Sequence, residues 1–116
     1  MMNSIKPYSR MERVGVQILT CLSEIKLQYI NLSNLGLVTF TSVDVSPDLK
    51  TAKVFYSVLG KKKSRKAINI DMNKKRKAFK KYLGPKLRIR YTPDLKFCID
   101  DSFAYGEKIS KLINAL

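Results

Sequence analysis

Residues 45–60, VSPDLKTAKVFYSVLG, constrain the fold more than any other part of the sequence. Ser46, Pro47 and Asp48 supply turn chemistry, because proline presets its own backbone angle and short polar side chains bond to nearby backbone groups. Beyond the turn, apolar residues recur at every second position, which places them on one face of a strand: Ala52, Val54, Tyr56 and Val58. The stretch therefore predicts a β-hairpin that ends at Gly60.

A helix is predicted before the hairpin. Ser9 and Glu12 have capping-box spacing, and an apolar stripe follows at three- and four-residue steps: Met11, Val14, Ile18, Leu22, Ile25 and Tyr29. The opposite, solvent-facing side is expected to carry Arg10, Arg13, Gln17, Thr20 and Glu24. Residues 31–36 break this helix, and residues 37–45 have the composition of a strand. The strand's alternation changes phase near Thr41 and Ser42, where we expect a bulge.

A second helical region is predicted to begin at a Ser64 cap. Its thin apolar stripe consists of Ile68, Met72, Phe79 and Leu83. Lys75 and Arg76 stand where the stripe needs another apolar residue, which predicts a bend or a split into two shorter helices. The sequence of Gly84 and Pro85 is typical of a helix end.

Residues 87–99 alternate most clearly of all, which predicts a strand with a core face of Leu87, Ile89, Tyr91, Leu95, Phe97 and Ile99. Pro93 cannot donate a backbone hydrogen bond, so we expect a bulge or an open edge there. Ser102 can cap a last helix that carries Ile109, Leu112, Ile113 and Leu116. The expected order is helix, strand, strand, one or two helices, strand, helix, an α+β class in a single domain over residues 1–116.

Positive charge is concentrated in the middle of the chain. Residues 61–90 hold fourteen of the 23 basic residues and a single acidic residue, Asp71. Self-repulsion on this scale destabilises a compact state, so the pattern indicates a polyanionic partner. Nucleic acid, whether duplex DNA or RNA, is the first candidate and an anionic membrane surface is the second. A solvated face without a partner is the plain alternative.

The candidate RNA-binding residues are cations of this block and its flanks. On a continuous helix Lys74, Lys77 and Lys81 would share one side with Arg76 and Lys80 beside them, so that they could track phosphates. The full set is Arg10, Arg13, Lys61, Lys62, Lys63, Arg65, Lys74, Lys75, Arg76, Lys77, Lys80, Lys81, Lys86, Arg88 and Arg90. Aromatic side chains could stack on bases, although their strand or stripe positions favour core packing: Phe55, Tyr56, Tyr82 and Tyr91.

Enzymatic signatures are missing from the sequence. It contains no histidine, no P-loop and no Gly-rich loop before a helix. Asp100 and Asp101 are adjacent carboxylates at a predicted strand-to-helix junction, where helix capping is favoured over catalysis or metal binding. We expect no enzymatic activity, no metal and no cofactor.

Cys21 and Cys98 lie too far apart for a metal-binding motif, and we expect them to be buried free thiols in a reducing cytoplasm. No stretch approaches the about 20 apolar residues that a membrane-spanning helix needs. The first ten residues lack the apolar run of a signal peptide. These features predict a soluble, cytoplasmic protein.

Two long stretches resemble a known family. Residues 35–60, LGLVTFTSVDVSPDLKTAKVFYSVLG, are similar to the signature region of bacterial ribosome-binding factor A. Residues 83–113, LGPKLRIRYTPDLKFCIDDSFAYGEKISKLI, resemble that family's leucine-glycine, arginine-bearing strand, proline-acidic-leucine and aspartate-serine-glycine segments in the same order. Arg10, Arg13 and Val14 match the Arg-x-x-Arg-Val pattern that opens the family's first helix.

The resemblance implies a KH-like fold of the second type, with helices on one face of a three-stranded mixed sheet. In place of the Gly-x-x-Gly loop of ordinary KH domains, the family has an alanine-x-glycine kink between two helices. The kink would fall at Lys75, Arg76 and Lys77, where neither small residue is present.

The function that the resemblance implies is late maturation of the small ribosomal subunit. The protein would be a monomer that binds the immature particle and its rRNA transiently, promotes processing of the rRNA 5′ end and supports growth at low temperature. Three other classes remain open, namely a permanent ribosomal protein, a general RNA-binding module and a membrane-surface module.

Overall fold

The computed structural model describes residues 9–87 and 89–100. These residues form α1 (Arg10–Gln28), β1 (Leu37–Val45), β2 (Thr51–Leu59), α2 (Arg65–Lys74), α3 (Arg76–Lys86) and β3 (Asp94–Ile99). This order confirms the α+β prediction as far as β3. The predicted last helix, with Ser102 as its cap, lies outside the described residues.

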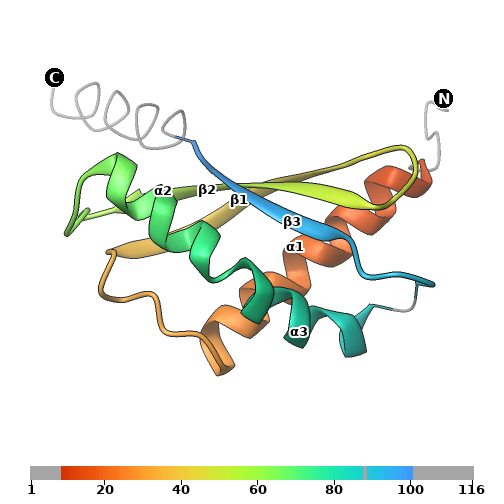
Figure 1. Cartoon of the computed structure of the whole chain (residues 1–116), viewed down its shortest axis with the longest axis horizontal. Helices are drawn as coiled ribbons and strands as arrows, with labels where there is room; N and C mark the ends of the chain where they lie inside the picture. The colour runs from red at the N-terminus through yellow and green to blue at the C-terminus, as the bar shows by residue number, and fades with distance from the viewer. Residues whose placement is uncertain (1–8, 88, 101–116) are drawn as a thin grey trace, which may run out of the picture.

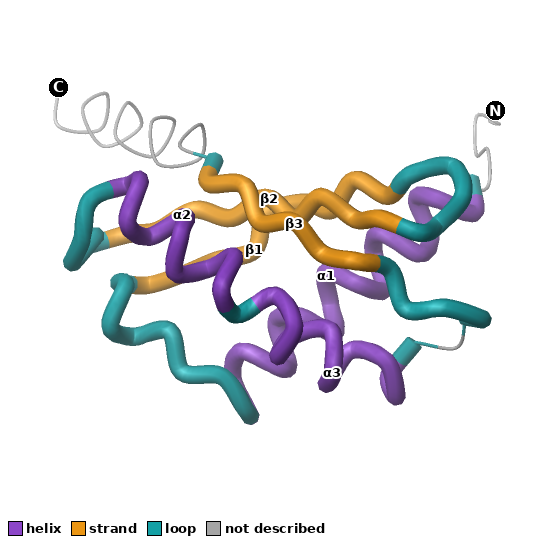
Figure 2. Tube along the Cα trace, viewed as in Figure 1, coloured by secondary structure: helices purple, strands orange, loops and turns teal. Residues whose placement is uncertain are grey.

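The three strands form one mixed sheet with β2 in the centre (Figure 2). β2 runs antiparallel to β1 and parallel to β3. The pairing of β1 with β2 shifts between Phe40 and Ser42, which confirms the predicted bulge. Ser46 closes the predicted hairpin, since its backbone N–H donates to the Thr51 carbonyl at 3.0 Å.

All three helices lie against one face of the sheet (Figure 1), as the KH-like prediction requires. The helices contribute buried residues to a single core with the sheet residues of that face. At its centre three aromatic rings from β1, α3 and β3 meet: Phe40, Phe79 and Phe97, with ring centroids 5.3 to 6.0 Å apart. Edge and offset contacts between such rings stabilise a core beyond the area that they bury.

Helix α1 begins at the predicted cap, because the Ser9 hydroxyl accepts a hydrogen bond from the Glu12 backbone N–H at 3.2 Å. The middle of the predicted stripe is buried: Val14, Ile18, Leu22 and Ile25. Its two ends are not, since Met11 is 36% exposed and Tyr29 is 55% exposed. These two predictions were wrong because both residues lie at the ends of the helix. Tyr29 instead stacks on Tyr82 of α3, with ring centroids 4.5 Å apart.

The loop between α1 and β1 fixes the position of the basic loop before α2. Gly36 has a φ of 127°, and a Cβ there would lie 2.7 Å from a methyl carbon of Val58, so glycine is required. The Leu35 carbonyl accepts a hydrogen bond from the backbone N–H of Lys62 at 3.1 Å. The loop that carries Lys61, Lys62 and Lys63 is therefore tied to the end of the sheet.

The predicted split of the second helical region is confirmed. Ser64 caps α2 by accepting from the Ala67 backbone N–H at 3.2 Å, and Lys75 separates α2 from α3. Gly84 does not end α3, which continues through Pro85 to Lys86. A Cβ at Gly84 would lie 3.2 Å from the Thr92 hydroxyl, so this glycine accommodates the close approach of the chain before β3.

The predicted strand over residues 87–99 was wrong in its first half. Only Asp94–Ile99 pairs with β2, in a register that sets Asp94 opposite Thr51. β2 begins at Thr51, so residues before Asp94 extend past the end of their partner strand, and Pro93 has no N–H to donate. Leu87 is still buried, but Tyr91 is 65% exposed instead of facing the core.

Asn73 of α2 covers the open edge of β3. Its side-chain oxygen accepts from the Phe97 backbone N–H at 2.9 Å, and its side-chain nitrogen donates to the Phe97 carbonyl at 3.0 Å. A neighbouring strand would pair the same two backbone groups, so Asn73 blocks edge-to-edge association at this position. The same side-chain nitrogen donates to the Asn69 carbonyl at 2.9 Å.

Replacing Asn73 by leucine should lower the free energy of unfolding by about 1–3 kcal/mol, because both backbone groups of Phe97 lose their partner. Urea unfolding followed by circular dichroism measures the change. The side chain of the exposed neighbour Lys74 makes no hydrogen bond within the described residues, and Lys74→Gln should stay within about 0.5 kcal/mol of the parent. Equal stability of Asn73→Leu and Lys74→Gln would show that the edge contact contributes nothing.

Candidate nucleic-acid interface

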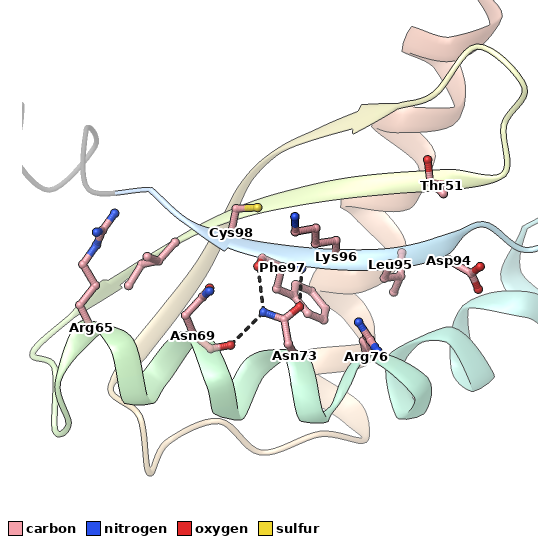
Figure 3. A pocket seen from close by; sticks show the side chains of 11 residues that line it. Thr51, Arg65, Asn69, Asn73, Arg76, Asp94, Leu95, Lys96, Phe97 and Cys98 are labelled. Carbon is pink, nitrogen blue, oxygen red and sulfur yellow. Dashed lines mark hydrogen bonds between the residues drawn. The ribbon is translucent and has the colours of Figure 1, made fainter.

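An open groove runs between α2 and the edge of β3 (Figure 3). Its lining combines the first residue of β2, polar side chains of α2, the first residue of α3 and the length of β3: Thr51, Arg65, Asn69, Asn73, Arg76, Asp94, Leu95, Lys96, Phe97, Cys98 and Ile99. Figure 3 shows Arg65 at one end, then the two asparagines, then Arg76, with Asp94 and Thr51 further along. The groove therefore has a cation on each side of the two asparagines, which supply hydrogen-bonding groups between them.

Helix periodicity places the two asparagines in the groove. Ile68 and Met72 are fully buried on the core side of α2. Asn69 and Asn73 each follow one of them in sequence, so they lie on the adjoining side of the helix, which faces β3. The Tyr56 hydroxyl donates to the side-chain oxygen of Asn69 at 2.8 Å, which orients that amide. Neither asparagine was predicted to belong to the site. Two asparagines four residues apart beside a buried stripe are the signal that could have indicated them.

The break between α2 and α3 exposes a helix start. Lys75 has a φ of −93° and a ψ of 0°, and within the described part of the chain no side chain caps the first turn of α3. The first N–H of α3 to reach a helical carbonyl is that of Phe79, which donates to Lys75 at 3.0 Å. The first turn contains Arg76 and Lys77 and no acidic residue. Unpaired amides, the helix dipole and two cations thus favour an anion at the same place.

Arg76 stands where three hollows of the surface meet. It borders the groove, a second hollow with Lys77, Lys80, Asp94 and Leu95, and a third with Asn69, Ile70, Asn73, Lys74 and Lys77. We call Lys74, Arg76, Lys77 and Lys80 the kink cations. The structure brings these four predicted residues, and Arg65 at the far end of the groove, onto one surface.

Carboxylates pair with some of the predicted cations within the described residues. Lys80 donates to Asp94 at 2.6 Å, Lys63 to Asp71 at 2.8 Å and Lys86 to Glu24 at 3.2 Å. The hydrogen bond from Lys80 and its charge lower the pKa of Asp94, and the hydrogen bond from Lys63 is the largest cause of the lowered pKa of Asp71. Exposed pairs of this kind contribute little to stability, so these cations can exchange partners at small cost.

The remaining predicted residues lie elsewhere. Lys61, Lys62 and Lys63 are exposed in the loop before α2, and Lys81 is exposed on α3. Arg10, Arg13 and Arg90 are exposed at or near the start of α1, which Figure 1 places at the opposite end of the molecule from the start of α2. Lys75 is half-buried, and Lys86 faces Glu24 of α1. Arg88 lies outside the described residues.

The four aromatic candidates differ in how deeply they are buried. Tyr56 is fully buried in the core and the half-buried Tyr82 packs against it, as their positions predicted. Phe55 is half-buried but is not among the core residues or those packed against them, so core packing is not confirmed for it. Tyr91 is exposed and does not belong to the core, which corrects its assignment. Cys21 and Cys98 are free thiols and half-buried, and burial is the largest cause of the raised pKa of Cys21.

Metal-ligand chemistry is not visible in the described part of the chain, where no three histidine, cysteine, aspartate or glutamate side chains gather into a possible site. Asp100 of the predicted carboxylate pair bonds through its backbone N–H to the Tyr56 carbonyl at 2.6 Å, whereas Asp101 lies outside the described residues. Among the helices described, none is long and apolar enough to span a bilayer.

Comparison with known proteins assigns the chain to a family. The family model for ribosome-binding factor A matches residues 10–113. Ribosome-binding factor A of Macrococcus caseolyticus (strain JCSC5402) is 40% identical over 107 residues, which cover 92% of this chain and 94% of that protein.

Solved structures agree with the fold. The crystal structure of ribosome-binding factor A from Thermus thermophilus superposes with a TM-score of 0.67 at 20% identity, covering 79% of this chain and 97% of that one. A Thermus thermophilus homology model fitted into the cryo-EM map of a 30S complex has a TM-score of 0.61 at 19% identity, covering 82% and 97%. With its sequence match over most of its length and the same arrangement of helices and sheet, the chain belongs to the ribosome-binding factor A family.

Proposed function

We propose that the protein is an assembly factor that binds the immature small ribosomal subunit through its rRNA, promotes late maturation and then leaves. The observation that carries the proposal is the gathering of the kink cations and Arg65 around one polar groove in a member of the ribosome-binding factor A family. A relative in that family has been fitted into a 30S complex. Processing of the rRNA 5′ end and growth in the cold are the cellular effects that we assign to this binding.

The chemistry of the groove suits binding without catalysis. Arg65 and Arg76 can contact phosphates. The uncapped start of α3, which carries Arg76 and Lys77, adds backbone N–H donors. The Asn73 amide is committed to Phe97 and the Asn69 side-chain oxygen to Tyr56, so the two asparagines offer only the Asn69 side-chain nitrogen for base readout. The groove would therefore recognise the path of an RNA backbone more than its sequence.

A factor of this kind acts by differential affinity. Binding one arrangement of an RNA better than another shifts the population toward that arrangement without any covalent step. The factor is released when the mature arrangement no longer offers the same phosphates to the groove. A monomer in the cytoplasm suffices for this role.

Binding to purified immature small subunits should weaken steeply with salt, because each phosphate contact releases counterions. With roughly five to nine contacts, a plot of log affinity against log salt should have a slope of about −4 to −8. Sedimentation binding between about 50 and 200 mM salt measures it. A nearly flat plot would contradict a phosphate-based interface.

Replacing Arg76 and Lys77 together by glutamine should reduce subunit affinity by about tenfold, since each lost phosphate contact near a surface costs on the order of 0.5–1 kcal/mol. The salt slope should become shallower by about 1.4–1.8. Both side chains are exposed and unpaired within the described residues, so thermal stability should not change.

The matched control replaces Lys62 and Lys66, which removes the same charge from exposed positions at the other end of α2. Its affinity should fall less than about threefold, because only the general attraction is reduced. If the control loses binding while the Arg76 and Lys77 variant keeps it, the interface lies at the loop before α2 and the kink assignment is wrong.

A further inference from the structure

Tyr91 is an exposed aromatic side chain that neither the core nor the groove uses. Its exposed fraction is 65%, and the guanidinium carbon of Arg90 lies 5.4 Å from its ring centroid. A cation at that distance is attracted by the ring and leaves part of the aromatic surface free. Large exposed aromatic rings beside a cation are typical of surfaces that bind unpaired bases.

The ring belongs to a hollow at the end of the molecule where α1 begins. Three segments far apart in the sequence meet there: Arg10 and Met11 of α1, the hairpin turn from Pro47 to Lys50, and the chain before β3 with Ile89, Arg90 and Tyr91. Figure 1 shows these segments at the same end of the fold, away from the start of α2. The hollow is therefore separate from the groove described above.

The floor of the hollow is apolar and built on a fixed turn. Leu49 is half-buried with a φ of 60°, and its backbone N–H donates to the Ser46 carbonyl at 2.9 Å. Ile89 is also half-buried and packs against the core. Such a surface can receive a flat, weakly polar group without first having to become ordered.

Charge around the rim favours an anion. Arg10, Lys50 and Arg90 line the hollow together with a single carboxylate, that of Asp48. Asp48 is committed to the turn, because one of its oxygens accepts from the Ser46 hydroxyl at 2.6 Å and from the Lys50 backbone N–H at 3.0 Å. The three cations make no ion pair within the residues that the structure describes.

We propose that this hollow binds one unpaired nucleotide of an RNA strand, with the base against Tyr91 and the flanking phosphates on Arg10, Lys50 and Arg90. An aromatic face, an apolar floor and surrounding cations match the three parts of a nucleotide better than they match an acidic peptide, which would use the cations alone. Bases within a duplex are covered by their neighbours, so the site selects single-stranded RNA. The inference rests on the proposed function, since it assigns a second contact on the same RNA-bearing partner.

The test measures fluorescence anisotropy of two labelled RNAs of equal length, an unstructured pyrimidine oligonucleotide and a stable duplex. Tyr91→Ala should weaken binding of the unstructured RNA about fivefold or more and change duplex binding less than about twofold. Tyr91→Phe keeps the ring and should bind both RNAs like the parent. Leu37→Ala, which truncates another side chain that is 61% exposed, is the matched control and should change neither affinity.

Three outcomes would overturn the inference. Tyr91→Ala would bind the unstructured RNA as the parent does, or it would lose both RNAs equally, or Tyr91→Phe would lose as much as Tyr91→Ala. Subunit sedimentation of the parent protein separates the two proposals. If the parent binds immature subunits but Tyr91→Ala does not change RNA affinity, only the nucleotide site is wrong. If the parent does not bind immature subunits, the proposed function is wrong.

Discussion

Phe97 is the residue through which the sheet and two of the helices are joined. Its side chain is fully buried and its ring meets those of Phe40, Tyr56 and Phe79. Its backbone N–H and carbonyl both bond to the Asn73 side chain, while the register of β3 on β2 sets it opposite Val54. Burying a phenylalanine side chain contributes about 1.5–3 kcal/mol, and the two hydrogen bonds hold α2 at a fixed distance from β3. The position of the groove therefore depends on one residue of its wall.

Concentrated positive charge opposes this compact arrangement, and the fold reduces the cost in two ways. Carboxylates from other elements reach the basic region, as Asp94 does for Lys80 and Glu24 for Lys86. The remaining cations lie exposed in water, where high dielectric weakens their mutual repulsion. An RNA backbone in the groove would remove more of that repulsion, because within the described residues only Lys80 among the kink cations has a carboxylate partner.

Local patterns in the sequence predicted the elements whose causes are local. The hairpin turn at Ser46, the bulge after Phe40 and the helix break at Lys75 all follow from residue types within a few positions of each feature. The start of β3 could not be predicted, because alternation over residues 87–99 does not reveal that β2 begins only at Thr51. Tyr91 was placed in the core for the same reason.

Features of the candidate site that depend on contacts between residues distant in sequence could not be predicted either. Asn73 and Phe97 are 24 positions apart, and nothing near either residue indicates that they pair. The sequence identified the cations, but it could not show that Arg76 borders three hollows while Arg10 and Arg90 lie beside a fourth. Charge composition reports how many cations a chain has, and only the fold decides which of them share a surface.

The break between α2 and α3 forms in this chain without the small residues that the family resemblance led us to expect. Lys75 adopts a backbone conformation that any L-amino acid can occupy, and within the described residues positive φ angles occur only at Gly36, Leu49 and Gly60. Glycine is therefore not needed at Lys75, Arg76 or Lys77.

Burial anchors the helices on both sides of the break. Met72 near the end of α2 and Phe79 in the first turns of α3 are both fully buried in the core. Arg76 and Lys77 at the turn itself are exposed, so packing in the core does not restrict these two side chains. In this chain they are cations, which places positive charge at the start of α3, where the helix dipole already favours an anion.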